Sequence, residues 1–374
     1  MSSTLNRREL LQSLLAAGVA LRADWPSLAQ GEEVVPFTDL PAPGRGRLPP
    51  TLETFLTPND AFFAVQHYPV PPPIDAAAYR LKVTGLVERP MDITLADLRK
   101  RARVEQVVGF ECSGNSNARG NPLLGNARWA GTALAAILRD ARITAPAREV
   151  VFFSSDSGEE EIVHGGAPEK VTQHFARSLG VDDATRPEVM LAWEMNGVDL
   201  PHAHGAPVRL IVPGWYGVAN VKWLDRIHVQ DSRFMGRFMA RDYVTLRGQD
   251  VAGETVWNET SVSRMQLKSA IGRLTRSGTT FKAVGFALTD GTPLRRIEVS
   301  VDGGAWKPAV LDGRNTPYSW QLFSYHWSGL EPGDHTIVSR ATDVRGTVQP
   351  TEADLVAKKT RWENNGQFPR KFRT

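Results

Sequence analysis

Short runs of apolar residues separated by turn residues dominate the chain. Residues 104–110 and 150–153 are apolar and rich in β-branched types, which predicts buried strands. Residues 79–85 alternate between apolar and polar types, which predicts a strand with one face exposed. The same criteria predict further strands at residues 62–68, 190–193, 207–214 and 221–229.

Helical signals are few and short. Thr94 followed by Asp97 three residues later has the form of an N-cap, and we expect a helix to begin there. A second helix is expected over residues 132–139, where Leu134, Ile137 and Leu138 fall on one face. Polar turns are predicted at 154–158 and at 196–197. Because the helices do not alternate regularly with the strands, the pattern indicates an α+β fold.

The pattern changes after about residue 248. A polar linker is expected up to residue 263, followed by short strands at 280–287, 295–301, 320–325 and 335–341. Regular short strands separated by turns are typical of an immunoglobulin-like β-sandwich. A chain of 374 residues is also longer than one core usually grows. We therefore expect two domains, at residues 31–255 and 256–374.

The first 30 residues have the features of an export signal. Arg7 and Arg8 precede an apolar run at residues 10–21, which is too short to cross a bilayer as a helix. This arrangement resembles a twin-arginine leader and predicts a periplasmic protein that folds before export. The alternative is an amphipathic N-terminal helix. Beyond the leader no segment is long and apolar enough to predict a membrane helix, so no span is expected in the mature chain.

Charge excludes one class of partner. The 44 Lys and Arg residues against 41 Asp and Glu residues give a net charge of +3, and no basic run is interleaved with aromatic residues. We therefore do not expect nucleic acid as a partner.

Cys112 is the single cysteine, and it lies where the strand predicted at 104–110 gives way to turn residues at 113–117. One thiol cannot form an internal disulfide. It is either a small buried apolar residue or a thiolate that acts as a metal ligand or nucleophile. Export to an oxidising compartment would require this thiol to be protected or occupied.

Other polar residues lie at predicted strand ends and form the remaining candidates. They are His67, Asp156, His164, His204, Arg209, Lys222 and Tyr243. His202 and His204 together also suggest a zinc site, and a cysteine hydrolase would need a histidine near Cys112. The chain has no His-Glu-x-x-His, Gly-x-Ser-x-Gly, Walker or Gly-x-Gly-x-x-Gly motif. Zinc hydrolase, serine hydrolase, NTPase and dinucleotide dehydrogenase functions lose most of their support.

Six motifs in order resemble the sulfite oxidase family of molybdopterin enzymes. They are Phe-Glu-Cys-Ser-Gly-Asn at 110–115, Asn-Ala-Arg-Trp-Ala-Gly-Thr at 126–132, Ala-Trp-Glu-Met-Asn-Gly at 192–197, His-Gly-Ala-Pro-Val-Arg at 204–209, Val-Lys-Trp-Leu at 221–224 and Ala-Arg-Asp-Tyr at 240–243. Residues 295–304 and 340–343 are similar to that family's C-terminal dimerisation domain. The resemblance implies a sulfite-oxidase-type molybdopterin-binding domain followed by the β-sandwich.

The resemblance also implies a molybdenum-molybdopterin cofactor and assigns roles to the candidates. Cys112 would supply the thiolate that ligates molybdenum, and a soft anionic sulfur suits such a metal. Tyr243 would lie beside the metal's equatorial oxygen and act in catalysis with Cys112 and His67. The pterin and its phosphate would be held by His67, Cys112, Asp156, His204, Arg209 and Lys222.

Three positions depart from the family pattern. Val65 and Asn117 occupy the places of two arginines that bind the substrate oxyanion in the family. Ala219 stands where the family often has an arginine near the phosphate. Arg119, or an arginine of the second domain, is a candidate replacement in the anion pocket.

The resemblance implies oxidation of sulfite or a related small sulfur compound. Because the chain lacks a Cys-x-x-Cys-His motif, electrons are expected to pass to an external carrier such as cytochrome c or a haem subunit. Two chains are expected to pair through the second domain. One alternative keeps the cofactor but changes the reaction to sulfane sulfur oxidation or to S-oxide or N-oxide reduction. Another is a binding protein without activity.

Overall fold

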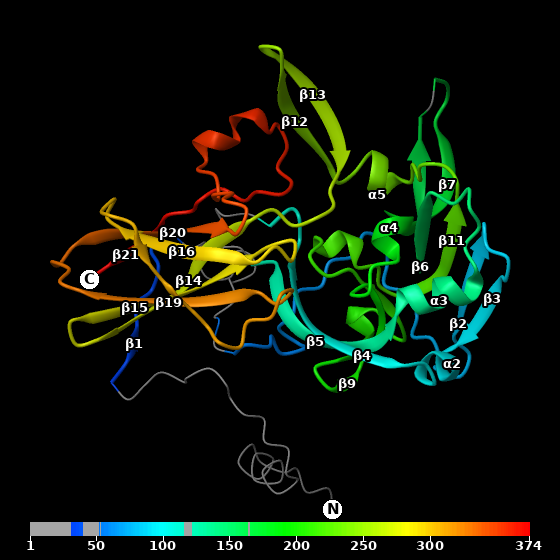
Figure 1. The fold of residues 1–374 in the computed structure, drawn as a ribbon, viewed down its shortest axis with the longest axis horizontal. Helices are drawn as coiled ribbons and strands as arrows, with labels where there is room; N and C mark the ends of the chain where they lie inside the picture. Colours follow the sequence, from blue (N-terminus) through cyan, green and yellow to red (C-terminus); the bar gives the residue numbers. More distant parts are fainter. Residues whose placement is uncertain (1–30, 40–51, 53, 116–121, 164) are drawn as a thin grey trace, which may run out of the picture.

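The computed structural model describes residues 31–374 except 40–51, 53, 116–121 and 164. The expected leader at 1–30, His164, Asn117 and Arg119 lie outside the described residues. Figure 1 shows the first part of the chain at the right and the strands of the last part at the left.

The first part is built on two five-stranded sheets. One has the order β3 (Met91–Thr94), β2 (Arg80–Gly85), β11 (Leu224–Gln230), β6 (Glu149–Ile162) and β7 (Glu169–Gly180). In this sheet β11 runs parallel to β2, and the other pairs are antiparallel. The other sheet has the order β10 (Arg209–Ile211), β8 (Met190–Met195), β5 (Leu124–Ala133) and β4 (Arg103–Glu111), with β9 (Val198–Asp199) paired to β8.

A single hydrophobic core joins these two sheets. Val83 and Phe152 come from the first sheet, and Val108 and Trp129 come from the second; all four are almost fully buried. Strand β2 shows how the sequence pattern produces this arrangement, because Leu81 and Val83 are buried and the residues between and beside them are not. The alternation predicted for residues 79–85 is therefore confirmed.

The described helices are short. They are α2 (Leu95–Arg99), α3 (Leu134–Ala141), α4 (Val181–Ala184) and α5 (Arg237–Ala240), with 3₁₀ turns η2 (His202–His204), η3 (Gly217–Ala219) and η4 (Ala353–Ala357). Thr94 caps α2 as predicted, because its hydroxyl accepts a hydrogen bond from the Asp97 amide. Helix α3 begins at Leu134, two residues later than predicted. The fold is thus mostly sheet, with less helix than the α+β expectation suggested.

Three local predictions are wrong. Residues 62–68 form no strand, and their irregular path carries Phe62 and Phe63 over the second sheet. Residues 154–158 do not form a turn but continue β6, with a register shift between Phe153 and Ser157 against β7. The expected linker at 248–263 is instead largely a hairpin of β12 (Val244–Val251) and β13 (Glu254–Ser261), which stands away from the body in Figure 1.

The last part of the chain, together with β1 from the start of the described residues, forms two further sheets. The first has the order β1 (Glu33–Val34), β14 (Lys268–Ser277), β15 (Thr280–Leu288), β19 (Gln321–Ser328) and β18 (Val310–Leu311). The second has the order β17 (Lys307–Pro308), β16 (Leu294–Val301), β20 (Asp334–Asp343) and β21 (Arg370–Arg373). The four strands predicted at 280–287, 295–301, 320–325 and 335–341 are all present.

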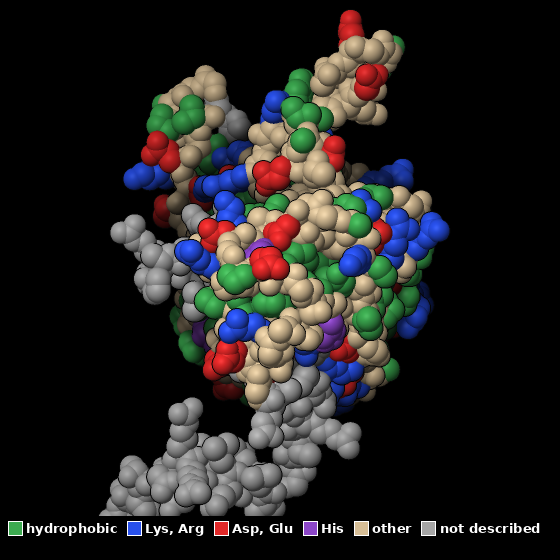
Figure 2. All heavy atoms as spheres, turned by 90° about the vertical axis from the view of Figure 1, so that its left-hand side faces the viewer, with side chains coloured by type: hydrophobic (Ala, Val, Ile, Leu, Met, Phe, Trp, Pro, Cys, Tyr) green, Lys and Arg blue, Asp and Glu red, His purple; other side chains and the backbone are tan. Residues whose placement is uncertain are grey.

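The two sheets enclose a second core. Leu274 and Phe323 of the first sheet pack in one cluster with Ile297 and Ile337 of the second. On the end of the molecule seen in Figure 2, acidic, basic and hydrophobic side chains are interspersed. The domain boundary expected between residues 255 and 256 falls within β13.

The last part packs directly against the first. Trp320 and Phe286 belong to the same buried cluster as Trp129 of β5. The Gly109 amide donates a hydrogen bond of 2.8 Å to the Tyr318 carbonyl, close to the end of β4. The strand that leads to Cys112 is therefore supported from both parts of the chain.

Candidate active site

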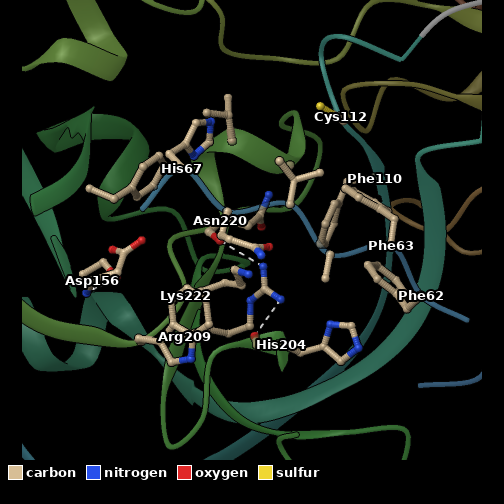
Figure 3. Close-up of a pocket in the computed structure, with 18 of the residues that line it drawn as sticks. Phe62, Phe63, His67, Phe110, Cys112, Asp156, His204, Arg209, Asn220 and Lys222 are labelled. Carbon is tan, nitrogen blue, oxygen red and sulfur yellow. Dashed lines mark hydrogen bonds between the residues drawn. The ribbon is translucent and has the colours of Figure 1, made fainter. Parts of the chain in front are cut away.

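One cavity brings together seven of the eight residues that the sequence singled out at strand ends. Figure 3 shows this cavity, which lies among segments that are far apart in the chain. The seven are His67, Cys112, Asp156, His204, Arg209, Lys222 and Tyr243. The eighth, His164, is not described.

Cys112 follows the last residue of β4, as predicted. Its amide donates to the Leu123 carbonyl at 2.9 Å, and its carbonyl accepts from the Asn115 amide at 2.8 Å. These two bonds form a tight turn that leaves the thiol half-buried. In Figure 3 the sulfur lies at one end of the cavity, and Arg209, Lys222 and His204 lie toward the other.

Arg209 is a buried cation at the far end. Its guanidinium donates to the carbonyls of His204 and Asn220, both at 2.9 Å, and it lies 4.8 Å from the centroid of the Trp129 ring. Burial lowers its pKa to about 9. Among the described residues it forms no salt bridge with a carboxylate.

Lys222 adds a second cation beside Arg209. Its ammonium group donates to the Ala203 carbonyl at 3.2 Å and lies 4.1 Å from the centroid of the Trp223 ring. Burial, and then the charge of Arg209, lower its pKa to about 7. Neither cation forms a salt bridge within the described part of the chain, which favours an anionic ligand, since burying them unpaired is costly.

Asp156 and His204 complete the polar lining. Asp156 is 3% exposed, and burial raises the pKa of its carboxyl group. His204 Nε2 lies 2.6 Å from the Asn59 carbonyl, and its ring packs edge-on against Phe62. Burial lowers the pKa of His204, so its imidazole is neutral at pH 7.

Two buried polar atoms of the lining have no hydrogen-bond partner among the residues that the structure describes. They are Oδ1 of Asp156 and Nε of Arg209. Buried polar atoms in proteins are nearly always hydrogen-bonded, so these atoms point to a polar ligand in the cavity. An elongated ligand with an anionic group near Arg209 and Lys222 and a soft metal near Cys112 matches this donor set. The residues present therefore fit a molybdenum-molybdopterin group.

Tyr243 and His67 form a pair beside Cys112. The Tyr243 hydroxyl lies 2.6 Å from Nε2 of His67, and the two rings meet edge to face. Burial lowers the pKa of His67 to about 4 and raises the pKa of Tyr243. Both side chains are therefore neutral at pH 7 and share one short hydrogen bond.

Cys112, Tyr243 and Val65 also line a second, wider space. We call this space the vestibule; its volume is about 630 Å³. Its lining residues are Val65, Cys112, Gly114, Asn115, Leu123, Tyr243, Glu352, Leu355, Lys358, Thr360, Arg361, Trp362 and Asn364. Val65 and the thiol therefore lie where the cavity meets the vestibule, which is the place where a substrate would meet a metal bound by Cys112.

Several residues near Cys112 were not predicted from the sequence. Glu111 and Lys268 form an ion pair of 2.9 Å in which both side chains are at most 3% exposed. The side-chain amide of Asn115 also donates to the Glu111 carboxylate. Trp362 stacks on Tyr243 at a centroid distance of 4.5 Å. Lys268 and Trp362 come from the last part of the chain. The one sequence signal that could have identified Lys268 is a lysine placed within a buried strand, and no such signal exists for Trp362.

The alternative of a zinc pair does not match the geometry. His202 Nε2 contacts the Pro71 carbonyl at 2.9 Å, while His204 contacts Asn59. Within the described ranges no three His, Cys, Asp or Glu side chains are placed to hold a metal ion by themselves.

In the part of the chain that the structure describes, no helix combines the length and hydrophobicity needed to cross a membrane.

Comparison with known proteins gives relatives over most of the chain. Residues 67–238 match the oxidoreductase molybdopterin-binding domain family. The chain is 31% identical over 333 residues to mitochondrial sulfite oxidase of Rattus norvegicus, and the alignment covers 81% of this chain and 59% of the rat protein. It is 31% identical over 331 residues to sulfite oxidase of Gallus gallus, covering 80% of this chain and 69% of the chicken protein.

A solved structure gives the same fold. The sulfane dehydrogenase SoxCD from Paracoccus pantotrophus superposes with a TM-score of 0.70 at 24% identity, covering 93% of this chain and 85% of that chain. The ordered motifs, the matched domain and the chicken enzyme agree with one another. This chain therefore belongs to the sulfite oxidase family of molybdopterin oxidoreductases.

Proposed function

We propose that this protein oxidises a small sulfur compound such as sulfite, with oxygen taken from water. For sulfite, the reaction converts sulfite and one water into sulfate, two protons and two electrons. The observation that carries the proposal is the position of Cys112, whose thiol lies where the cofactor-type cavity meets an open vestibule. When bound, the molybdenum cofactor supplies a centre that accepts the two electrons.

The residues of the cavity would hold the cofactor at both ends. The Cys112 thiolate would ligate the metal, and Arg209 and Lys222 would bind the pterin phosphate. Because Arg209 is already fixed by two carbonyls, its remaining Nε donor would reach the ligand without a further ordering cost. Asp156 Oδ1, which also lacks a partner, would accept a hydrogen bond from a ring N–H of the pterin.

Tyr243 and His67 would handle the protons of the reaction. The Tyr243 hydroxyl lies beside the Cys112 end of the cavity and can donate a hydrogen bond to an oxygen there. Nε2 of His67, 2.6 Å away, can exchange that proton with the hydroxyl. The neutral state of both groups at pH 7 suits a relay that passes a proton without leaving a buried charge.

Val65 bears on the choice of substrate. It lines the cavity and the vestibule at the position of a family arginine. A buried charge-assisted hydrogen bond contributes about 1.5–3 kcal/mol, so losing two such arginines would weaken sulfite binding by about a hundredfold or more. This favours a sulfur compound that is less anionic than sulfite, and oxidation of sulfane sulfur is the second candidate. The fold neighbour SoxCD, titled a sulfane dehydrogenase, is consistent with it.

Location and partners belong to the same proposal. The paired arginines at 7 and 8 support export to the periplasm through the twin-arginine route. The absence of a haem-attachment motif in the sequence supports electron transfer to an external cytochrome c or haem subunit. We further propose that the two C-terminal sheets form an immunoglobulin-like sandwich through which two chains pair. The regular short strands around one core support the first part of this statement.

The test is to purify the exported protein, measure molybdenum per chain, and assay sulfite and an organic persulfide with cytochrome c as acceptor. We expect molybdenum near one per chain and turnover of at least one of the two compounds. Metal with turnover of the persulfide alone would favour sulfane oxidation. Metal without turnover of either would overturn the proposed oxidation, and an S-oxide with a reduced dye would then be the next substrate to assay. Protein without molybdenum would refute the cofactor assignment and leave the binding-protein alternative.

A further inference from the structure

Trp362 covers the active-site end of the vestibule from the last part of the chain. Its ring stacks on Tyr243 with centroids 4.5 Å apart and an interplanar angle of 28°. A Cβ atom at Gly114 would lie 3.0 Å from Cζ3 of the same indole, and 4.0 Å from the Cys112 sulfur. The indole is therefore packed closely over both the tyrosine and the cysteine loop.

Glu363, the next residue, fixes the indole in this place. Its amide donates to the Ser113 carbonyl at 2.7 Å, which joins it to the Cys112 loop. Its buried carboxylate accepts hydrogen bonds from Thr245 at 2.8 Å and from Arg247 at 2.7 Å, and both donors lie on β12 directly after Tyr243. Glu363 thus ties together the three segments that meet around the aromatic stack, through its backbone amide on one side and its carboxylate on the other.

Lys358 holds the segment from the other side. Its ammonium group donates to the carbonyls of Trp362 at 2.7 Å and Glu363 at 2.8 Å. Tyr243 and Glu363 both have left-handed backbone conformations, with φ of 58° and 56°. Residues other than glycine adopt this conformation at a cost, and such strain is concentrated at functional sites. The structure therefore maintains the Tyr243–Trp362 stack against local backbone preference.

The vestibule wall is mixed in polarity, and part of it near Cys112 is apolar. Val65, Leu123 and Trp362 are among its lining residues. Two cations also line the vestibule, but Lys358 is engaged with two carbonyls, and the Arg361 guanidinium lies over the indole at 4.5 Å from its centroid. Within the described lining both cations are thus held by other groups, so a compact oxyanion would gain few charge-assisted hydrogen bonds in exchange for its water.

We infer that Trp362 is a specificity-determining residue, which makes the vestibule select an uncharged or organic sulfur group over a compact sulfur oxyanion. The inference rests on the proposed function and names its substrate class. Stacked between the vestibule and Tyr243, the indole offers a rigid apolar face to a carbon or sulfane substituent of the substrate. A sulfur atom carried on such a substituent would be delivered between Val65 and Trp362 to the Cys112 end of the cavity.

The test measures equilibrium binding to the molybdenum-loaded protein by calorimetry. The two probes are methyl phenyl sulfone, an organic sulfur compound, and sulfate, a compact oxyanion; neither can be oxidised further. Trp362→Ala is expected to raise the dissociation constant of the sulfone about tenfold, because it removes a stacking face and its buried area. The dissociation constant of sulfate is expected to stay within about twofold, because Trp362 supplies no charge to it.

Matched variants separate specificity from folding. Trp257→Ala removes a tryptophan that is 44% exposed on the hairpin and outside the vestibule lining, and both constants should stay unchanged. Trp362→Phe should restore most of the sulfone affinity. If Trp362→Ala does not fold, Trp362→Leu replaces it, because leucine keeps apolar volume but cannot stack. The ratio of the sulfone to the sulfate dissociation constant must then rise, as expected for Trp362→Ala. An unchanged sulfone constant, or equal weakening of both probes, would overturn the inference.

This test is independent of the test of the proposed function. If the wild-type protein holds molybdenum but turns over no sulfur compound, the proposed oxidation is refuted, whereas the ratio of the two binding constants still decides the role of Trp362. If it turns over sulfur compounds while the ratio is the same in all Trp362 variants, only the inference about the indole is refuted.

Discussion

The buried ion pair between Glu111 and Lys268 gives the sharpest prediction about stability. The carboxylate precedes Cys112, and the ammonium group lies on β14 in the last part of the chain, 2.9 Å away. Their side chains are 3% and 1% exposed. Removing one partner of such a pair leaves an uncompensated buried charge, which costs about 3–5 kcal/mol. We therefore expect Lys268→Met or Glu111→Gln alone to lower the free energy of unfolding by about that amount.

The double variant tests whether the loss comes from the pair itself. Glu111→Gln combined with Lys268→Met removes both charges, so its loss should be well below the sum of the two single losses. Urea unfolding followed by tryptophan fluorescence provides the measurement. Arg99→Met is the control, because the Arg99–Asp199 pair has a similar distance of 2.7 Å but side chains that are 45% and 81% exposed. This exposed pair is expected to contribute much less.

The same substitutions have a consequence for the site. Glu111 also accepts a hydrogen bond of 2.8 Å from Asn115, which closes the Cys112 turn. Lys268→Met should therefore reduce molybdenum content along with stability. Two results would refute the reasoning: single variants as stable as the wild type, or a double variant whose loss equals the sum of the single losses. Stable single variants would mean that the two charges are hydrated rather than buried. A double variant whose loss equals the sum would mean that the two charges do not interact.

Three further predictions concern the substrate, the cofactor and the proton relay. Val65→Arg combined with Asn117→Arg should raise kcat/KM for sulfite, measured with cytochrome c, and no gain would show that the anion site is built differently. The pKa of Lys222 is lowered to about 7, and a bound phosphate dianion would raise it, so the complex takes up a proton and cofactor affinity falls as pH rises above 7. When Lys222→Arg is titrated with cofactor across this range, its affinity should be nearly independent of pH. A dependence of affinity on pH as steep as that of the wild type would refute the assignment. Tyr243→Phe should lower kcat about a hundredfold at unchanged molybdenum content. Because the pKa of His67 is lowered to about 4, His67 should stay neutral down to about pH 5, and an inflection of kcat near pH 6.5 that vanishes on substituting His67 would contradict this.

The sequence predicted the parts of the site that lie at strand ends. Cys112 directly after β4, and Arg209 at the start of β10, could be placed because apolar runs locate strands and the polar residues at their ends face a common cavity. The motif resemblance then supplied the cofactor. The export signal, the electron acceptor and the pairing of two chains remain predictions.

The sequence did not predict contacts between distant segments. Trp362 lies in a polar stretch without periodicity, so nothing local indicates that it stacks on Tyr243. The hairpin of β12 and β13 was mistaken for a linker, because its strands are mostly exposed and carry no alternation of buried residues. The segment with Phe62 and Phe63 has the composition of a strand, but its apolar side chains are used to wall the cavity instead.

The central claim is that the Cys112 thiolate ligates molybdenum at the boundary between the cavity and the vestibule. X-ray absorption at the molybdenum edge measures this most directly, because it counts the sulfur atoms bound to the metal. Loaded Cys112→Ser protein is expected to show one sulfur ligand fewer than the wild type and to lose the thiolate-to-metal absorption band. An unchanged sulfur count and an unchanged band in Cys112→Ser would contradict it.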